Sequence, residues 1–105
     1  MKEVTVDELK SMMDNKEDFQ LIDVREAYEY ENANLGATLI PLNTIINQPE
    51  QINKTGKTII HCRSGARSAA AIQQLEIKYG LTNLYNLKGG ILAWSKQIDQ
   101  SLKVS

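Results

Sequence analysis

A cysteine and two arginines stand close together in the middle of the chain. Four residues separate Cys62 from Arg67: Arg63, Ser64, Gly65 and Ala66. The segment falls where a strand is expected to end and a helix to begin, so a tight loop there would aim successive backbone N–H groups into one concavity. Gly65 permits backbone angles that other residues resist. With the charges of Arg63 and Arg67, these amides predict a cradle for an anion.

Cys62 is expected at the rim of this cradle. The thiolate is the nucleophilic form of cysteine, and a helix N-terminus with nearby arginine lowers the pKa of a thiol. The groups that would hold an anionic substrate therefore also favour ionisation of Cys62. The alternative is a buried cysteine that packs as a small hydrophobe, which is common. We disfavour it because an inert core cysteine needs neither two arginines nor a glycine turn, although either arginine alone could be a solvated surface charge.

Other polar residues near this loop are expected to support it. Asp23 and Arg25 end a buried strand on the same edge, where an ion pair or hydrogen bonds would brace neighbouring loops; direct contact with substrate is the less favoured role. His61 precedes Cys62, but neighbours on a strand point to opposite faces. We therefore expect a packed, hydrogen-bonded histidine rather than a base. We include Ser68, which closes the same segment, as a further supporting residue.

Three aromatic residues and a glycine pair allow more than one interpretation. Tyr28 and Tyr30 either line the site or cover the sheet, and the sequence leaves both open. Trp94 lies on a helical stripe and is expected in the core. Gly89–Gly90 most simply forms a tight turn, and a second use would be to let that turn approach the Cys62 loop.

The rest of the sequence indicates which elements position these residues. Short apolar runs alternate along the chain with helical patterns, which is typical of a parallel sheet with crossover helices. Thr5 and Glu8 have the spacing of a capping box, so a first helix should follow Thr5 and bury Val6, Leu9, Met12 and Met13. Strands are expected at Phe19–Val24, Thr38–Ile40, Thr58–Cys62 and Leu84–Leu87. Further helices are expected at Glu26–Asn32, at Asn43–Ile52 with a break near Pro49, at Ala66–Tyr79 with Gly80 as its C-cap, and along Ile91, Trp94 and Ile98. In the Ala66–Tyr79 helix, Ser68, Ala71, Ile72, Leu75 and Tyr79 share one face. The order is roughly βαβαβαβαβα, an α/β domain with helices on both faces of its sheet.

Composition narrows the classes of function. The chain has 105 residues, the size of one domain, with 12 basic and 13 acidic side chains. This balance gives no general attraction to nucleic acid or to a membrane. A single cysteine cannot form a disulfide within the chain and fits a reducing compartment. No signal peptide or membrane span is visible, so we expect a cytoplasmic protein. One cysteine and one histidine do not supply a metal site.

Four blocks of sequence resemble the rhodanese family, and they occur in the order typical of that family. Ile60–Ser68 resembles its active-site loop, and Leu21–Glu26 resembles its first signature. Gly36–Ala37 with Ile40–Leu42 resembles a second stretch, and Leu87–Trp94 resembles the C-terminal signature. The blocks run through nearly the whole chain, which makes the resemblance more specific than the cysteine loop alone.

The resemblance implies a single rhodanese-like domain over residues 1–105 with a central five-stranded parallel sheet. It also implies a sulfurtransferase that uses no metal or organic cofactor. Cys62 would be the catalytic nucleophile that takes a sulfane sulfur from a small-molecule donor such as thiosulfate, and the persulfide would pass it to cyanide, to a thiol or to a protein partner. The amides of Arg63, Ser64, Gly65, Ala66 and Arg67 would hold the persulfide, and Arg67 would close the loop.

The sequence departs from the family pattern at one place. Where family members commonly carry Gly-His-Ile-Pro-Gly-Ala, this chain has the shorter Ala33–Ala37, without the histidine or proline. The departure lies at one edge of the expected site and leaves the Cys62 loop intact.

Two other functions compete with sulfur transfer. Phosphatases and arsenate reductases with a related fold place five residues between cysteine and arginine, whereas this chain has four between Cys62 and Arg67. A smaller ring of amides suits a sulfur atom better than a tetrahedral phosphate. A non-catalytic binding or sulfur-carrier module is the other alternative, although inactive relatives usually lack the cysteine.

Overall fold

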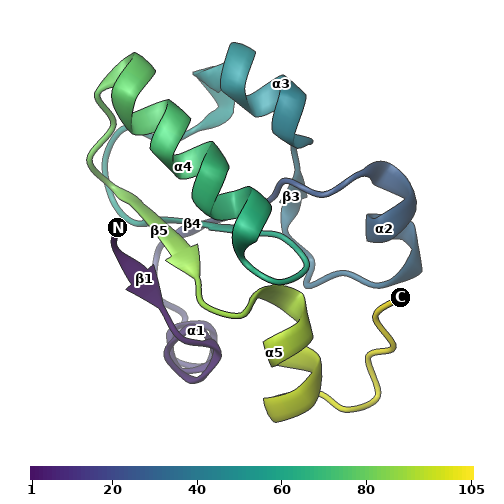
Figure 1. Ribbon diagram of the computed structural model, residues 1–105. Coiled ribbons are helices and arrows are strands. Elements are labelled where there is room, and N and C mark those ends of the chain that lie inside the picture. The colour runs from purple at the N-terminus through teal and green to yellow at the C-terminus, as the bar shows by residue number, and fades with distance from the viewer.

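The computed structural model describes all 105 residues and contains a five-stranded sheet (Figure 1). The strands lie side by side in the order β1-β5-β4-β2-β3, and every pair is parallel. In chain order the elements are β1 (Glu3–Val4), α1 (Val6–Asp14), β2 (Gln20–Asp23), α2 (Ala27–Asn32), β3 (Thr38–Leu39), α3 (Leu42–Asn47), the 3-10 helix η1 (Pro49–Gln51), β4 (Thr58–His61), α4 (Ala66–Tyr79), β5 (Leu84–Leu87) and α5 (Gly90–Gln97). The predicted α/β fold with a five-stranded parallel sheet is confirmed.

Helices cover both faces of the sheet. Figure 1 shows α3 and α4 together on one face and α1 and α5 on the other, with α2 beyond the β3 edge. Each face of the sheet has its own hydrophobic core. Alternate residues of the central strand β4 pack into one core or the other, because neighbouring side chains point to opposite faces. Ile60 packs in the core under α3 and α4, and Ile59 packs with Leu9 and Trp94 on the other side. Every residue of β4 is buried, as its apolar run predicts.

The N-terminal helix begins where the sequence predicts. The Thr5 hydroxyl accepts a hydrogen bond from the amide of Glu8 at 3.1 Å, and the Glu8 carboxylate accepts one from the amide of Thr5 at 2.9 Å. The order of elements predicted from the sequence begins with a strand before this helix, but no residues were assigned to that strand. The structure places this strand at Glu3–Val4, paired with Asn86 and Leu87 of β5.

Two details differ from the sequence prediction. The segment expected as one broken helix from Asn43 to Ile52 is a six-residue helix, α3, followed by a separate 3-10 turn that starts at Pro49. Tyr79, expected on the buried face of α4, is 37% exposed, and its hydroxyl donates to the carbonyl of Ile46 at 2.7 Å. The last buried residue of α4 is Leu75, so the final turn of the helix extends beyond the core.

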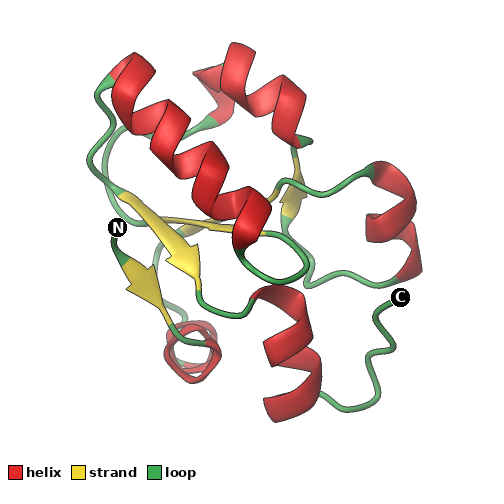
Figure 2. Cartoon of the chain, viewed as in Figure 1, coloured by secondary structure: helices red, strands yellow, loops and turns green.

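The parallel arrangement brings the ends of β2 and β4 to one edge of the sheet. Asp23 and His61, the last residues of these strands, are direct neighbours in the register. The loop from Cys62 to Gly65 leaves the sheet at this edge and enters α4, where ligands commonly bind in such folds. In Figure 2 this green loop lies beside the start of α5. None of the helices is both long and apolar enough to cross a membrane.

Candidate active site

Cys62 lies inside the loop that joins β4 to α4, and not at its rim. Only 1% of the surface of Cys62 is exposed to solvent. The sulfur accepts hydrogen bonds from the amide of Gly65 at 3.1 Å and from the amide of Ser68 at 3.4 Å. The hydroxyl of Ser68 is also 3.4 Å from the sulfur. Three donors from the loop and the first turn of α4 therefore converge on one sulfur atom.

Two opposing effects set the pKa of the Cys62 thiol. Burial raises the pKa, while hydrogen bonds from the Ser68 hydroxyl and from the amides of Ser68, Gly65 and Ser64 lower it. The hydrogen bonds prevail, and the pKa lies below its ordinary value. The loop therefore favours the thiolate, which is the reactive form.

The loop conformation depends on Gly65 and on a residue of the neighbouring strand. Gly65 has φ +106°, a left-handed conformation that suits glycine. Its carbonyl accepts hydrogen bonds from the Ser68 hydroxyl at 3.2 Å and from the side-chain Nδ2 of Asn86 at 3.1 Å. Asn86 is a buried polar residue within β5. The sequence did not point to Asn86 as a site residue, although a lone asparagine in an apolar strand is a signal that could have done so.

The first turn of α5 holds the other side of the loop. The amides of Ile91 and Leu92 donate to the carbonyls of Cys62 and Arg63, each at 3.0 Å. These bonds turn both carbonyls toward α5. Gly90 makes the approach possible, because a Cβ there would lie 2.5 Å from the Arg63 oxygen and 2.6 Å from the Cys62 oxygen. The Gly89–Gly90 pair thus has both of the expected uses, the turn and the close approach.

Arg67 does not leave a free positive charge beside the sulfur. Its guanidinium makes two hydrogen bonds to Glu29 of α2, at 2.7 Å and 2.8 Å. The hydrogen bond from Arg67 lowers the pKa of Glu29 to about 2 despite burial, and the same bond raises the pKa of Arg67. Glu29 was not identified from the sequence. It lies 38 residues before Arg67, and no local pattern joins the two.

The remaining predicted loop residues are exposed. The Arg63 side chain turns toward the end of the chain, where its Nε donates to the carbonyl of Ser105 at 2.8 Å. Ser64 and Ala66 are also exposed. Of these, Ser64 acts on Cys62 through its backbone amide, which helps to lower the thiol pKa.

Asp23 and Arg25 form a buried ion pair beside the loop. The two residues are 0% and 1% exposed, and Arg25 Nη2 lies 2.8 Å from an Asp23 oxygen. Arg25 also donates to the carbonyl of Ala33 at 2.7 Å. The pair therefore braces the segment that follows α2, and its burial separates it from solvent.

The short Ala33–Ala37 segment is held without the family's histidine and proline. The Tyr30 hydroxyl donates to the carbonyl of Ala37 at 2.7 Å, so this tyrosine braces the segment. The side chain of Asn34 accepts from the amide of Gly36 at 2.8 Å and shapes the turn. Tyr28 is 71% exposed.

His61 is buried behind the loop and makes no hydrogen bond to the sulfur. Its Nδ1 is 3.3 Å from the Cys62 carbonyl, and its Nε2 lies 3.6 Å from an Asp23 oxygen without a hydrogen bond. Burial lowers the pKa of His61 despite the nearby carboxylate, so the ring is neutral. This packing agrees with the expected structural histidine, although only one of the ring nitrogens is bonded.

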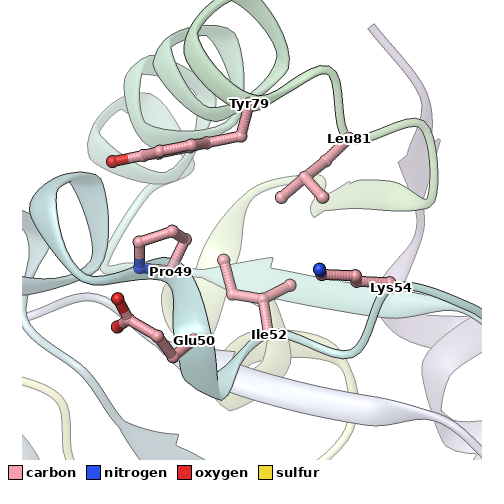
Figure 3. A pocket seen from close by; sticks show the side chains of 6 residues that line it. All are labelled: Pro49, Glu50, Ile52, Lys54, Tyr79 and Leu81. Atoms are coloured by element: carbon pink, nitrogen blue, oxygen red, sulfur yellow. The ribbon is translucent and has the colours of Figure 1, made fainter.

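Other parts of the molecule offer no comparable arrangement. No group of three or more His, Cys, Asp or Glu side chains could hold a metal ion. A hollow of about 260 Å³ lies beside the C-terminal end of α4, where Tyr79 and Leu81 form part of its wall (Figure 3). Its walls are Pro49, Ile52, Tyr79 and Leu81, with Glu50 and Lys54 as the charged residues. Its lining contains no cysteine, serine, threonine or histidine.

The fold and the cysteine loop define a class of α/β domain that presents a hydrogen-bonded thiol at the carboxyl edge of a parallel sheet. Comparison with known proteins identifies this class. Residues 5–97 match the family described as the Rhodanese-like domain. The chain belongs to the rhodanese-like family.

Similar proteins include sulfurtransferases by name. The chain is 34% identical over 103 residues to "Probable adenylyltransferase/sulfurtransferase MoeZ" of Mycobacterium tuberculosis, which covers 94% of this chain but 26% of that protein. It is 32% identical over 97 residues to a "Sulfurtransferase" of Allochromatium vinosum, covering 91% and 90% of the two chains. A crystal structure of a rhodanese-like domain protein from Staphylococcus aureus has a TM-score of 0.83 and 33% identity, covering 100% of this chain and 99% of that one.

Proposed function

We propose that the protein is a sulfurtransferase that carries sulfane sulfur as a persulfide on Cys62. The observation that carries this proposal is the convergence of the Gly65 amide, the Ser68 amide and the Ser68 hydroxyl on the Cys62 sulfur. These donors favour the thiolate, and they lie where a negative charge on a persulfide would need stabilisation. The names of two relatives, both sulfurtransferases, support the same chemistry.

The reaction proceeds in two transfers. The Cys62 thiolate attacks the sulfane sulfur of a donor such as thiosulfate, a new S–S bond forms, and the donor's S–S bond breaks. Its electron pair leaves with sulfite, and Cys62 carries an anionic persulfide. An acceptor, either cyanide or a thiol of a small molecule or a protein, then attacks the outer sulfur and releases the Cys62 thiolate. Each step is a nucleophilic displacement, so no redox cofactor takes part.

The loop residues divide this work between backbone and side chains. The amides of Ser64, Gly65 and Ser68 stabilise negative charge, and Ser68 adds its hydroxyl. Asp23 and Arg25 act at a distance by bracing the neighbouring loop. The same backbone loop also contains Arg63, Ala66 and Arg67. We therefore propose these three residues as substrate-binding positions.

Mass spectrometry of the intact protein tests the proposal. Treatment with thiosulfate should add one sulfur atom, peptide mapping should place it on Cys62, and cyanide should remove it. The Cys62→Ser variant should gain no sulfur and should lose thiosulfate:cyanide activity. Full activity in Cys62→Ser would show that another group is the nucleophile. A Cys62 that no sulfane donor can load would favour the alternative of a non-catalytic binding module.

A further inference from the structure

The guanidinium of Arg67 is the charged group that the loop sequence offers to a substrate, yet a carboxylate already holds it. Both terminal nitrogens of Arg67 bond to the two oxygens of Glu29, at 2.7 Å and 2.8 Å. This two-bond geometry is the strongest way in which arginine binds a carboxylate. The Glu29 side chain is 10% exposed, so water screens it little, whereas that of Arg67 is 37% exposed.

Glu29 is itself fixed in place. The same oxygen that binds Arg67 accepts the amide of Glu26 at 3.1 Å, in the capping box of α2. The backbone carbonyl of Glu29 lies 3.5 Å from Nη1 of the buried Arg25. The Glu26 amide therefore holds the carboxylate and Arg25 holds the backbone of the same residue, so the pair is a built feature of the site rather than a mobile surface contact.

The pair changes what the loop can attract. Thiosulfate carries two negative charges, which its terminal sulfur shares with a sulfonate group, and the sulfonate would remain outside the ring of amides around Cys62. A free guanidinium would bind that sulfonate with two parallel hydrogen bonds. With Arg67 paired to Glu29, the amides around Cys62 remain for the transferred sulfur, and the Arg67 guanidinium is not free to take the sulfonate in this way. Arg63, the other arginine of the loop, is exposed and turned toward Ser105.

We propose that Glu29 is a specificity-determining residue that withholds Arg67 from the donor and makes the site favour hydropersulfides of small thiols over dianionic thiosulfate. The inference rests on the proposed sulfurtransferase function and names the donor class for the same site. A hydropersulfide has a single terminal sulfur that fits the amide ring, and it carries no sulfonate to be bound outside it. Glu29 acts on selectivity through Arg67 and touches no reacting atom.

The transfer from such a donor is balanced without a further reagent. The Cys62 thiolate attacks the outer sulfur of R–S–SH, a bond forms between the two sulfurs, and the donor's S–S bond breaks. The electron pair leaves on R–S⁻, and the proton first stays on the transferred sulfur. It then passes to water, because the backbone N–H donors favour the anionic persulfide. Cys62 then carries the same anionic persulfide that thiosulfate would produce.

The test compares two donors in two glutamate variants on α2. Glu29→Gln keeps the size of the side chain but removes its charge, and Glu31→Gln is the matched control at an exposed position of the same helix. The kcat/KM is measured for thiosulfate and for cysteine hydropersulfide with one common acceptor. We expect Glu29→Gln to raise kcat/KM for thiosulfate about fivefold, mainly by lowering KM. A change of this size corresponds to one charge interaction at a partly exposed site. The value for the hydropersulfide should change less than twofold, and Glu31→Gln should change neither.

Salt separates an electrostatic role from a structural one. The gain in Glu29→Gln should fall markedly at about 0.5 M salt, because salt screens the attraction between the partly exposed guanidinium and the thiosulfate dianion. The double variant Glu29→Gln/Arg67→Gln should lose the gain that Glu29→Gln shows with thiosulfate, because the freed guanidinium is no longer present. Equal losses with both donors, or a gain that persists in high salt, would show that Glu29 only braces the loop.

The wild type supplies a test that needs no variant. Its kcat/KM should be higher for cysteine hydropersulfide than for thiosulfate, and the reverse order overturns the inference about Glu29. A wild-type Cys62 that neither donor loads, by intact mass, overturns the proposed function itself. The two failures therefore give different results.

Discussion

The hydroxyl of Ser68 lies 2.6 Å from Oδ1 of Asn86, a buried residue of β5. The same hydroxyl is 3.4 Å from the Cys62 sulfur, and the Asn86 side-chain amide donates to the carbonyl of Gly65 at 3.1 Å. A hydroxyl has one proton to donate, so Ser68 shares it among the Asn86 oxygen, the Gly65 carbonyl and the Cys62 sulfur. Asn86 thereby fixes both the position of the hydroxyl and the turn of the loop.

Ser68→Ala should raise the pKa of Cys62, because burial already raises it and the variant removes a hydrogen bond that lowers it. The rate of alkylation by iodoacetamide against pH measures the change. The wild-type midpoint should lie below that of a free thiol, and reactivity should fall as the pH drops through it. In Ser68→Ala the whole curve should move to higher pH. Ser64→Ala is the control, since Ser64 contributes its backbone amide, which alanine retains. Equal midpoints in Ser68→Ala and the wild type would contradict this account.

Gly90→Ala should disrupt the site through a backbone contact. The new Cβ would lie 2.5 Å from the Arg63 oxygen, and Gly90 has φ +59°. Crowding and left-handed strain together should lower the free energy of unfolding by about 3 kcal/mol or more, with loss of sulfur transfer. Gly80→Ala has a similar φ of +67° but open space around it. It should cost about 1 kcal/mol and leave activity intact. Urea unfolding and the thiosulfate:cyanide assay measure both, and equal losses in the two variants would exclude crowding as the cause.

Arg25→Ala should destabilise the fold by about 3–5 kcal/mol, because it leaves the buried carboxylate of Asp23 without its partner. Lys10→Ala removes the exposed ion pair with Asp14 and should cost less than about 1 kcal/mol. Chemical unfolding of both variants provides the measurement. A cost for Arg25→Ala no larger than that for Lys10→Ala would mean that the Asp23 pair contributes little.

Local patterns in the sequence predicted the parts of the structure that local interactions determine. The capping box of Thr5 and Glu8 spans three residues, and its two hydrogen bonds form within one turn. The segment from Cys62 to Arg67 likewise forms its loop from neighbouring amides. In both cases spacing along the chain carries enough information, because the interacting groups are separated by less than two turns of helix.

Contacts between distant elements could not be predicted in the same way. Glu29 and Arg67 are 38 residues apart, and Asn86 of strand β5 contacts Ser68 of helix α4. Nothing in either local sequence selects the partner; the parallel sheet and the placement of α2 do so. The two-residue strand β1 escaped assignment because Glu3–Val4 is too short to show alternation. The prediction that Arg67 adds a fixed positive charge to the cradle did not include Glu29, which pairs with that charge.

Loop length distinguishes sulfur transfer from phosphoryl transfer. Both reactions need a cysteine of low pKa in a ring of amides, so residue types alone do not separate them. In this chain the amides of Gly65 and Ser68 reach the Cys62 sulfur itself, at 3.1 Å and 3.4 Å. Donors that already converge on the sulfur are poorly placed for the three oxygens of a phosphoryl group, whose stabilisation provides much of the catalysis of its transfer.

The native protein should therefore show negligible activity on aryl phosphates and should transfer sulfur from a sulfane donor much faster. Loss of one well-placed donor to a developing anion typically costs about a hundred- to a thousandfold in rate, so even one misplaced amide is enough. Insertion of one glycine after Gly65 should widen the ring and lower sulfur transfer. Release of p-nitrophenol from its phosphate, measured beside thiocyanate formation, checks both, and Cys62→Ser gives the background. Faster hydrolysis of the aryl phosphate than sulfur transfer in the unmodified protein would refute the role of loop length, because the native ring would then accommodate a phosphoryl group.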